Sequence, residues 1–431
     1  MTLKRHEGFL LYIKITRYTV LAFLLTNHLT TRLITRFITR QTARSDGDKK
    51  MMIANLSIWE KESYYAPQDL VIVGAGLMGL WTALELKKHR PSLRITILER
   101  NTTPLGASTR NAGFACFGSP TELIHDADTL GPDAMLAVAE MRYKGIQKIR
   151  RHFTDEQIGF DACGGYECIN RDYKNWALLP DKLHWLNSLL KEITGSKAIF
   201  QQIDHKLAAM GLQGFDALVE NVTEAALHSG KLVQALTQKV QATGVNILYG
   251  IQVSGIEKQS ASMQINTLQN QAFTAAHVLL CTNAFTSELA PEARIEPARG
   301  QVIVTSPIPG LPMKGTFHFD EGFYYWRNLG NRILLGGARN SAFEAEATTN
   351  LSGSDTVRLA LEHFLTQHLH PSFQYTIEHH WSGVMGFTTD KRPYTALVRE
   401  GVTAAIACNG MGVALTPVVA EQLSTGLLDY F

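Results

Sequence analysis

The spacing of apolar residues changes abruptly within the stretch from Leu70 to Arg100. Leu70 to Val73 form a continuous apolar run that ends at Gly74, and the following apolar residues are spaced as on one helix: Leu77, Leu80, Trp81, Leu84 and Leu86. Pro91 blocks continuation of that helix, and a second apolar run covers Arg94 to Leu98. The pattern predicts a strand, a tight turn, a helix and a second strand.

Three glycines occupy the turn in the order G-x-G-x-x-G, as Gly74, Gly76 and Gly79. Such glycines permit in turn the tight bend, the close approach of a pyrophosphate and the packing of helix on strand. Glu99 and Arg100 follow the second strand, and a carboxylate at that position accepts both ribose hydroxyls of an adenosine. Strand, helix, strand and terminal acid together predict a dinucleotide-binding unit.

The remaining periodicity predicts further regular elements on both sides of several glycine-rich breaks. Helices are expected at Asp133–His152, Leu183–Ile193 and Gly230–Ala242, the last of them capped by Ser229. Strands are expected as two short segments within 158–170 and at Val245–Leu248 and Val278–Cys281. A final strand, a Gly-x-Gly turn and a helix that ends near Leu428 complete the chain.

The charge is unevenly distributed along the 431 residues. The formal net charge is +2, but residues 1–50 hold ten Lys or Arg against three acids, which leaves the body with 31 bases and 36 acids. A body of charge −5 does not favour nucleic acid as a partner. Residues 1–50 are interpreted as a basic extension, either disordered or upstream of a true start at Met51 or Met52, with a membrane-surface helix over 31–44 as the alternative.

The five cysteines are odd in number and match no zinc spacing, so reduced thiols in a cytoplasmic protein are expected. Adjacent His379 and His380 would point to opposite faces of a strand. No metal site is therefore predicted. The most apolar N-terminal window is too short for a membrane span, and no firm membrane association is expected.

The loop from Pro104 to Phe114 is rich in small and polar residues that suit the wrapping of a ligand. It resembles the Gly-Ala-Ser-x-x-Asn-x-Gly stretch of the D-amino-acid oxidase family of flavoproteins, which includes glycine, sarcosine and γ-glutamylputrescine oxidases. The resemblance implies that Ser108, Arg110, Asn111 and Gly113 lie along the pyrophosphate and flavin edge of FAD.

Three later motifs extend this resemblance over about residues 68–428. Val253 lies where the family contacts the adenine side of FAD, and Asn283 replaces a family glycine, although Asn tolerates positive φ better than most residues. The turn at Gly410, Met411 and Gly412 resembles the one that faces the flavin pyrimidine ring. Trp381 to Pro393 resembles the family signature but contains no cysteine for flavin attachment, which implies non-covalent FAD.

An aromatic strand predicted over Phe323–Arg327 suggests the substrate-binding residues. Period two places Tyr325 and Arg327 on one face and Tyr324 and Trp326 on the other. A guanidinium with aromatic neighbours binds a carboxylate bidentately, and glycine oxidases carry an arginine at the corresponding strand end. Arg327 and Tyr325 are therefore the predicted catalytic residues. The competing interpretation is an Arg on a solvated strand face, in which case Arg339 or Arg392 is the alternative.

The expected fold is α/β, a discontinuous Rossmann-like FAD-binding domain (68–155, 223–296 and 373–431) with a second substrate domain (156–222 and 297–372) on a mixed or antiparallel sheet. The expected reaction is oxidation of a C–N bond in a small amino acid or amine, with hydride passing to the flavin and the imine then hydrolysed. The alternatives are a nicotinamide-dependent dehydrogenase, a membrane-associated dehydrogenase that reduces quinone, and a flavin domain for RNA modification.

Overall fold

The structure is a computed structural model, and it describes residues 56–369, 373–406 and 408–431. The predictions for residues 1–50 therefore lie outside the described residues. Among the described residues, 56–65 and Gln269–Gln271 form one unit, in which the short helix α2 (Ile58–Glu62) is capped by Ser57. Ala66–Leu268 and Ala272–Phe431 form a second unit, and all that follows concerns this second unit.

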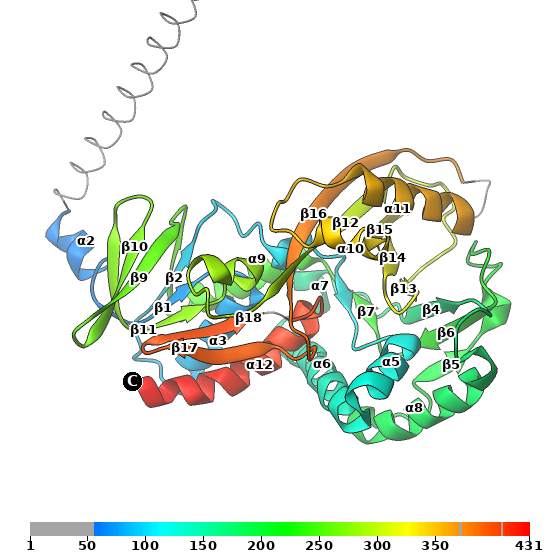
Figure 1. The fold of residues 1–431 in the computed structure, drawn as a ribbon, viewed down its shortest axis with the longest axis horizontal. Coiled ribbons are helices and arrows are strands. Elements are labelled where there is room, and N and C mark those ends of the chain that lie inside the picture. Colours follow the sequence, from blue (N-terminus) through cyan, green and yellow to red (C-terminus); the bar gives the residue numbers. More distant parts are fainter. Residues whose placement is uncertain (1–55, 370–372, 407) are drawn as a thin grey trace, which may run out of the picture. The chain divides into compact units, whose positions relative to one another are not determined.

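The first sheet of the unit contains the predicted βαβ element at its centre. Its strands are β1 (Gln68–Val73), β2 (Ile95–Glu99), β8 (Asn246–Tyr249), β9 (Val253–Gln259), β10 (Ser262–Thr267), β11 (Ala272–Leu280), β17 (Tyr394–Arg399) and β18 (Val402–Ile406). The order β17-β18-β11-β1-β2-β8 is parallel from β18 to β8, while β9 and β10 form an antiparallel extension beside β11 (Figure 1). This is the Rossmann-like arrangement that the sequence predicts.

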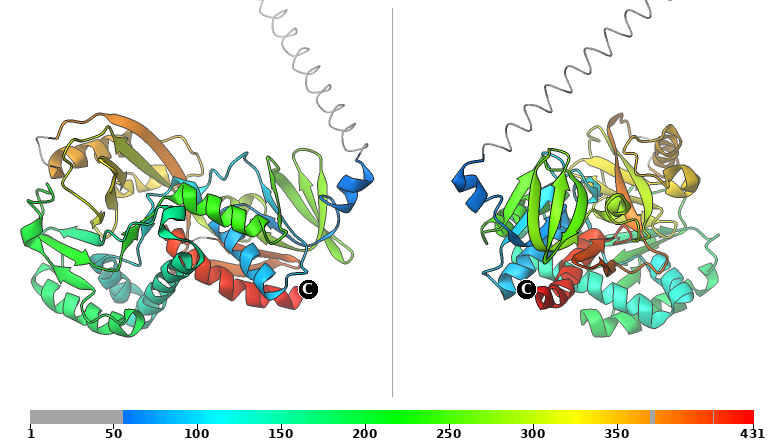
Figure 2. Two further views of the ribbon diagram at one scale, coloured as in Figure 1. Left: turned by 180° about the vertical axis from the view of Figure 1, so that it is seen from behind. Right: turned by 60° about the vertical axis from the view of Figure 1, so that its left-hand side comes forward.

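Helices cover this sheet and fix the position of its central turn. They include α3 (Leu77–His89), α6 (Pro132–His152), α9 (Ser229–Gln241) and α12 (Gly412–Leu427). Helix α12 packs on both α3 and α6, and both views of Figure 2 show α12 beside α3. Lys148 Nζ lies 2.7 Å from Glu85 Oε1 and 2.7 Å from Glu421 Oε2, so one ion triad, buried at Glu85 and Lys148 and exposed at Glu421, joins helices α3, α6 and α12.

The second sheet is mixed, with the order β16-β12-β15-β14-β13-β4-β6-β5. Its strands are β4 (Gly165–Ile169), β5 (Phe200–Gln202), β6 (Ala217–Asn221), β12 (Glu296–Thr305), β13 (Thr316–Phe319), β14 (Tyr324–Leu329), β15 (Arg332–Gly337) and β16 (Ile377–Phe387). Strand β16 pairs along its length with β12. It therefore belongs to the second sheet, although its residues fall in the segment 373–431 that was predicted for the FAD-binding domain.

The remaining elements connect or cover the two sheets. They are α4 (Ala107–Arg110), β3 (Phe114–Ala115), α5 (Pro120–Leu130), α7 (Asp155–Ile158), α8 (Leu179–Thr194), β7 (Ala225–Ala226), α10 (Phe343–Glu346), α11 (Asp355–His368) and five 3-10 turns at Trp176–Leu178, Asp204–Lys206, Asn283–Glu288, Arg339–Ser341 and Leu428–Tyr430. Among the described residues, no helix is both long enough and apolar enough to cross a membrane.

Two local predictions are wrong. Residues 158–170 contain the end of α7 and the single strand β4 rather than two short strands. Helix α9 is capped by His228, whose Nδ1 accepts a hydrogen bond from the backbone N–H of Lys231 at 3.2 Å. The hydroxyl of Ser229, the predicted cap, instead donates to Asn111 Oδ1 at 2.6 Å, because the neighbouring loop supplies an acceptor that local sequence does not reveal.

Alternate side chains of β14 point to opposite faces, as the two-residue period of a strand predicts. Trp326 stacks on Phe317 with ring centroids 5.3 Å apart, and Tyr324 stacks on Phe364 at 4.5 Å, within one aromatic core. Tyr325 lies on the opposite face, where Phe114 meets its ring edge-on at 6.0 Å. That second face is the one that borders the cavity described next.

Candidate active site

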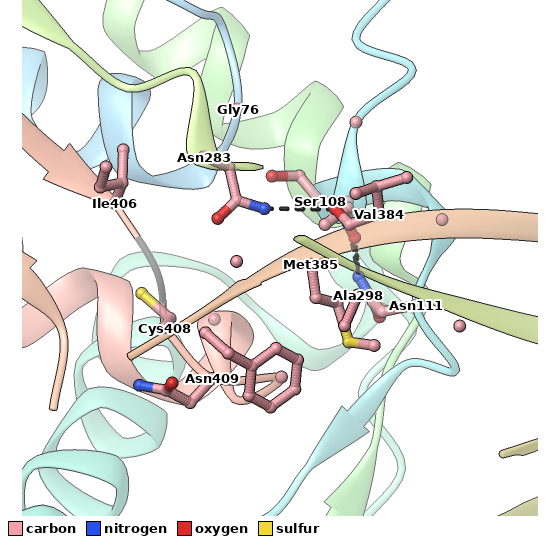
Figure 3. A pocket seen from close by; sticks show the side chains of 18 of the residues that line it. Gly76, Ser108, Asn111, Asn283, Ala298, Val384, Met385, Ile406, Cys408 and Asn409 are labelled. Atoms are coloured by element: carbon pink, nitrogen blue, oxygen red, sulfur yellow. Dashed lines mark hydrogen bonds between the residues drawn. The ribbon is translucent and has the colours of Figure 1, made fainter. Parts of the chain in front are cut away.

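A cavity of about 980 Å³ extends from the carboxyl ends of β1 and β2 to the inner face of the second sheet. Figure 3 shows that its walls come from segments far apart in the chain, among them Gly76 and Ser108, Asn283, Met385, and Cys408 with Asn409. Ligands of open α/β sheets bind at the carboxyl ends of the strands. One continuous cavity therefore joins the predicted nucleotide site to the second sheet.

The three motif glycines are required by the local geometry. Gly74 has φ +110°, and an added Cβ would lie 2.7 Å from the carbonyl oxygen of Cys281. An added Cβ on Gly79 would lie 2.2 Å from the carbonyl oxygen of Gly74, so this glycine permits helix α3 to pack against the turn. Gly79 does not line the cavity, whereas Gly74 and Gly76 do.

Gly76 precedes helix α3 and faces Ser108. An added Cβ would lie 2.9 Å from Ser108 Oγ, which accepts a hydrogen bond from the backbone N–H of Leu77 at 2.9 Å. A hydroxyl oxygen thus already meets the first amide of the helix, where phosphate oxygens are stabilised by unpaired amides and the helix dipole. This part of the cavity fits a pyrophosphate.

Glu99 is fixed at the end of β2 and lines the same cavity. Its Oε2 accepts a hydrogen bond from the backbone N–H of Ala75 at 3.1 Å, and its Oε1 accepts one from the backbone N–H of Asn101 at 3.0 Å. Arg100 and Val253 line the cavity nearby, and the Arg100 guanidinium lies 4.0 Å from the ring centroid of Phe285. The carboxylate and apolar surface fit a ribose and an adenine.

The loop of residues 104–114 is held together by Asn111. Its side-chain amide donates to the carbonyl oxygens of Ala107 and Ser108 at 3.0 and 2.9 Å, and its Oδ1 accepts from the N–H of Gly113 at 2.8 Å. Asn111, Ser108 and Arg110 line the cavity, and Arg110 also donates to the carbonyl oxygen of Ser382 at 2.7 Å. The loop is thereby shaped before any ligand binds.

The predicted turn before helix α12 closes the cavity on another side. Gly410, Met411 and Gly412 all line it, and Gly410 has φ +82°. Asn283 and Asn409 have φ +50° each, so Asn283 adopts the left-handed conformation expected of a residue that replaces a glycine. Asn409, which sequence reasoning missed, accepts from the N–H of Thr388 at 2.8 Å and ties the turn to the segment after β16.

Three cysteines line the cavity, although none lies in the stretch Trp381–Pro393. They are Cys116, Cys281 and Cys408. Burial raises the pKa of all three thiols, that of Cys408 to about 12. Because the thiolate is the reactive form, these groups are poor nucleophiles at neutral pH.

The two predicted catalytic residues are separated by the structure. Tyr325 lines the cavity, and burial raises its pKa to about 12, so its hydroxyl remains protonated. Arg327 does not line the cavity: its NH1 donates to the carbonyl oxygens of Gly113 and Leu227, both at 2.8 Å, and its Nε donates to the carbonyl oxygen of Asn328 at 3.1 Å. These bonds do not fit the predicted binding of a substrate carboxylate, because they engage the guanidinium in holding backbone.

Gly113 shares this structural role. It does not line the cavity, has φ +75°, and accepts a hydrogen bond from the backbone N–H of Leu227 at 2.8 Å. An added Cβ would lie 2.3 Å from the carbonyl oxygen of Leu227. The Gly113–Leu227–Arg327 contact therefore positions the loop rather than touching the cavity.

Arg339 supplies the guanidinium that Arg327 does not. It lines the cavity just after β15, with its Cζ 4.8 Å from the ring centroid of Phe343 and 5.0 Å from that of Phe387. Burial lowers its pKa, and among the described residues it has neither a carboxylate within ion-pair distance nor a hydrogen-bond acceptor. Arg392, the other alternative from the sequence, is exposed and outside the cavity lining.

A second polar group lies at the end of the cavity next to helix α5. Glu122 and Arg142 line it as a pair, with Glu122 Oε1 2.9 Å from Arg142 NH1. His318 also lines it and is the cross-strand neighbour of Tyr325 in the β13–β14 pair. Sequence reasoning missed this group, because its members come from α5, α6 and β13 with no fixed spacing.

The FAD dependent oxidoreductase family model matches residues 69–425, and the chain belongs to that family. The protein is accordingly an FAD-dependent oxidoreductase. The geometry above fits FAD on grounds of its own, since the glycine turn, the start of α3, Glu99 and the α12 turn border one cavity. Among the described residues no group of three or more His, Cys, Asp or Glu side chains is arranged to hold a metal ion.

Several known proteins are similar over most of the chain. The probable oxidoreductase OrdL of Rhizobium meliloti (strain 1021) is 22% identical over 366 residues, which cover 80% of each chain. L-2-hydroxyglutarate dehydrogenase of Escherichia coli (strain K12) is 23% identical over 336 residues, which cover 69% of this chain and 72% of that one. The crystal structure of glycine oxidase from Geobacillus kaustophilus superposes with a TM-score of 0.66 at 19% identity, over 84% of this chain and 95% of that one, which shows the shared fold.

Proposed function

We propose that the protein oxidises the C–N bond of a small amino acid or amine that bears a carboxylate. The observation that carries this proposal is Arg339, a half-buried guanidinium without an acidic partner among the described residues, which lies against two aromatic rings in the wall of the cofactor cavity. A half-buried cation of this kind is stabilised by an anionic ligand, and a guanidinium binds a carboxylate bidentately.

The chain's own groups then have distinct tasks. Arg339 binds the carboxylate, and Tyr325, a neutral hydroxyl on the same inner face, donates to it. The rings of Phe343 and Phe387 cover part of the guanidinium and so reduce the water around its bond to the anion. These groups orient the substrate, which is the main contribution of a protein to flavin chemistry.

FAD, when bound, supplies the acceptor for the two electrons and the hydrogen that leave the substrate carbon. As the hydride leaves the carbon and a proton leaves the nitrogen to solvent, the carbon–nitrogen single bond becomes an imine, and water then hydrolyses the imine to a carbonyl compound and free ammonia or amine. The proposed cofactor contacts are those that line the cavity, namely Gly74, Gly76, Glu99, Arg100, Ser108, Arg110, Asn111, Val253, Gly410, Met411 and Gly412.

A second candidate reaction is the oxidation of a 2-hydroxy acid, favoured by the similarity to L-2-hydroxyglutarate dehydrogenase. Arg339 would bind the carboxylate of either substrate, so the cavity wall does not choose between C–N and C–O oxidation. Oxygen or a quinone then reoxidises the flavin.

The proposal is tested by anaerobic bleaching of the flavin absorbance with matched pairs of substrates. Each pair is an amino acid and the 2-hydroxy acid with the same side chain, in both stereoisomers, alongside the amine that lacks the carboxylate. We expect an amino acid to bleach the flavin much faster than its hydroxy analogue and than the simple amine. Faster bleaching by the hydroxy acid would refute C–N oxidation in favour of C–O oxidation. Equal bleaching rates with the amino acid and with the amine that lacks the carboxylate would refute the role of Arg339.

A further inference from the structure

We propose that the far end of the cavity is a second substrate subsite, formed by Glu122, His318 and Glu321, which binds a cationic nitrogen group at the distal end of the substrate. This inference rests on the proposed function, because the subsite selects among the amino acids and amines that Arg339 would anchor. We call these three residues the acidic subsite, and all three line the cavity.

His318 is the feature that points to a ligand. Its side chain is buried, with 8% of the residue exposed, and it has no hydrogen-bond partner among the described residues. Burial lowers its pKa to about 4 despite the opposing influence of Glu122. The imidazole is therefore neutral at physiological pH and offers one nitrogen as an acceptor and one as a donor.

The two carboxylates of the subsite come from different elements, Glu122 from helix α5 and Glu321 from the turn after β13. Burial acts to raise the pKa of Glu122, but the positive charges of Arg142 and Lys391 act against it and the pKa is lowered, so Glu122 is ionised. Glu321 follows β13 in a turn where Asp320 and Glu321 both have positive φ, +56° and +51°, a conformation that non-glycine residues adopt at a cost.

Helix α5 joins the two sides. His125 lies one turn after Glu122 on α5, and its Nδ1 is 3.1 Å from Glu321 Oε2. This contact holds the Glu321 side chain beside the helix that carries Glu122. Two carboxylates and a neutral imidazole thus border one end of the cavity.

Two more carboxyl groups lie behind the subsite. Glu167 is the β4 neighbour of His318 across the β13–β4 pair, and Glu224 accepts from the backbone N–H of Phe117 at 3.2 Å. Burial raises the pKa of Glu167 to about 7 and that of Glu224 to about 8, and the negative charge of Glu122 adds to both shifts. Both groups hold a proton during part of the neutral pH range.

The positive groups that face the subsite do not balance these acids. Arg142 pairs with Glu122, Lys174 Nζ lies 3.8 Å from Glu321 Oε1, and Lys391 pairs with Asp126. Glu122 and Glu321 thus have one cation each, whereas Glu167 and Glu224 have none among the described ion pairs, and each adds a negative charge when it loses its proton. A cation in the cavity would compensate the excess, whereas a second carboxylate would add to it.

The expected length of the substrate follows from the spacing of strands in the second sheet. His318 is on β13, and Arg339 follows β15, with β14 and Tyr325 between them. Adjacent strands are about 4.8 Å apart, so the backbones of β13 and β15 are separated by roughly 10 Å, and the substrate is expected to span a similar length. Glycine is too short to reach both, and an amino acid with a long side chain that ends in an ammonium or guanidinium suits the span.

Arginine and citrulline provide the test, because they have the same length and differ in the charge of the distal group. We expect the holoenzyme to prefer arginine over citrulline in kcat/KM by about tenfold or more, for the reactive stereoisomer. Glu122→Gln and Glu321→Gln should each lower kcat/KM for arginine and so bring the ratio of arginine to citrulline toward one. Glu344→Gln, an exposed glutamate in the wall of the same cavity, is the matched control and should leave the ratio unchanged.

A binding measurement separates this inference from the proposed reaction. 5-Guanidinopentanoate and pentanoate lack the α-amine, and their binding is followed through the perturbation of the flavin spectrum. We expect tighter binding of the guanidinium compound, with protons released from the carboxyl groups behind the subsite and detected by titration calorimetry in two buffers. If no amino acid bleaches the flavin but this preference holds, only the proposed function fails; if citrulline and pentanoate match their cationic partners, the acidic subsite is refuted.

Glu122→Gln leaves Arg142 without its carboxylate, so a loss of folding is possible for that variant alone. The Glu122→Gln protein must retain FAD and an unchanged melting temperature before its ratio of kcat/KM for arginine to that for citrulline is interpreted. Glu321→Gln is the second variant, since the Glu321 side chain is 27% exposed and its ion-pair partners are His125 and Lys174. An unchanged arginine preference in a folded Glu321→Gln protein would also count against the inference.

Discussion

Replacement of Arg327 and of Arg339 by methionine distinguishes the two arginines that the sequence places near the substrate. Arg327 NH1 donates to two buried carbonyl oxygens, and Gly113 O has a second donor in the N–H of Leu227, whereas Leu227 O has no other donor among the described contacts. Arg327→Met therefore leaves Leu227 O unpaired. Arg339→Met removes a guanidinium that contacts only aromatic rings among the described residues.

The two substitutions are expected to change different quantities, the unfolding free energy for Arg327→Met and kcat/KM for Arg339→Met. An unpaired buried carbonyl costs about 1–3 kcal/mol, and the lost bonds to a charged donor bring the total for Arg327→Met to about 2–4 kcal/mol of unfolding free energy. A buried charge-assisted pair with the substrate is worth about 2–5 kcal/mol, so Arg339→Met should lower kcat/KM for a carboxylate substrate roughly 30- to 4,000-fold. It should change stability much less.

The assay combines urea unfolding with steady-state kinetics on one carboxylate substrate and on the amine that lacks the acid. Arg327→Met should move the unfolding midpoint and leave the ratio of the two substrates unchanged. Arg339→Met should collapse that ratio toward one while FAD content stays intact. The reasoning would be refuted by the reverse result, a folded Arg327→Met protein that has lost its carboxylate preference beside an Arg339→Met protein that has kept it.

Four further predictions concern the cofactor and stability. Gly76→Val should purify without flavin, because its side chain would press on Ser108 and enter the cavity, and full FAD occupancy would contradict this. Acid precipitation should release all flavin into the supernatant, and colour in the pellet would reveal a covalent link. Lys148→Met should cost about 3 kcal/mol of unfolding free energy, because buried Glu85 would keep only the exposed Lys88, whose Nζ lies 3.7 Å from Glu85 Oε2, and an unchanged urea midpoint would argue against the triad. Because burial raises the pKa of Glu224 to about 8, the folded state retains a proton that the unfolded state loses. The free energy of unfolding should therefore fall by a few kcal/mol between about pH 5 and 8, and it should fall less in Glu224→Gln. Unfolding at several pH values tests this, and an identical pH dependence of stability in the two proteins would contradict it.

The cofactor end was predictable because its signals are local. Gly74, Gly76, Gly79 and Glu99 act within one strand–turn–helix–strand segment, and a positive φ or a close backbone contact leaves only glycine. The face of β14 was equally predictable, since alternation places Tyr325 opposite Trp326. Such inferences need no knowledge of distant segments.

The substrate end was less predictable because it depends on contacts between distant segments. Alternation places Arg327 on the same face as Tyr325, but only the tertiary structure shows that the loop at Gly113 and Leu227 covers that end of the strand. Arg339 acquires its ring contacts from Phe343 and Phe387, and the second of these belongs to β16. Sequence spacing contains no information on the contacts that either arginine makes.

The stoichiometry of a single anaerobic turnover tests the central claim most directly. The FAD-bound protein is mixed with an excess of the amino acid that bleaches it fastest, and the ammonia released is measured against the flavin reduced. Oxidation of the C–N bond predicts one ammonia, or one amine from an N-substituted substrate, for each flavin reduced, together with one equivalent of the 2-oxo acid. Full bleaching without release of ammonia or amine would contradict the account.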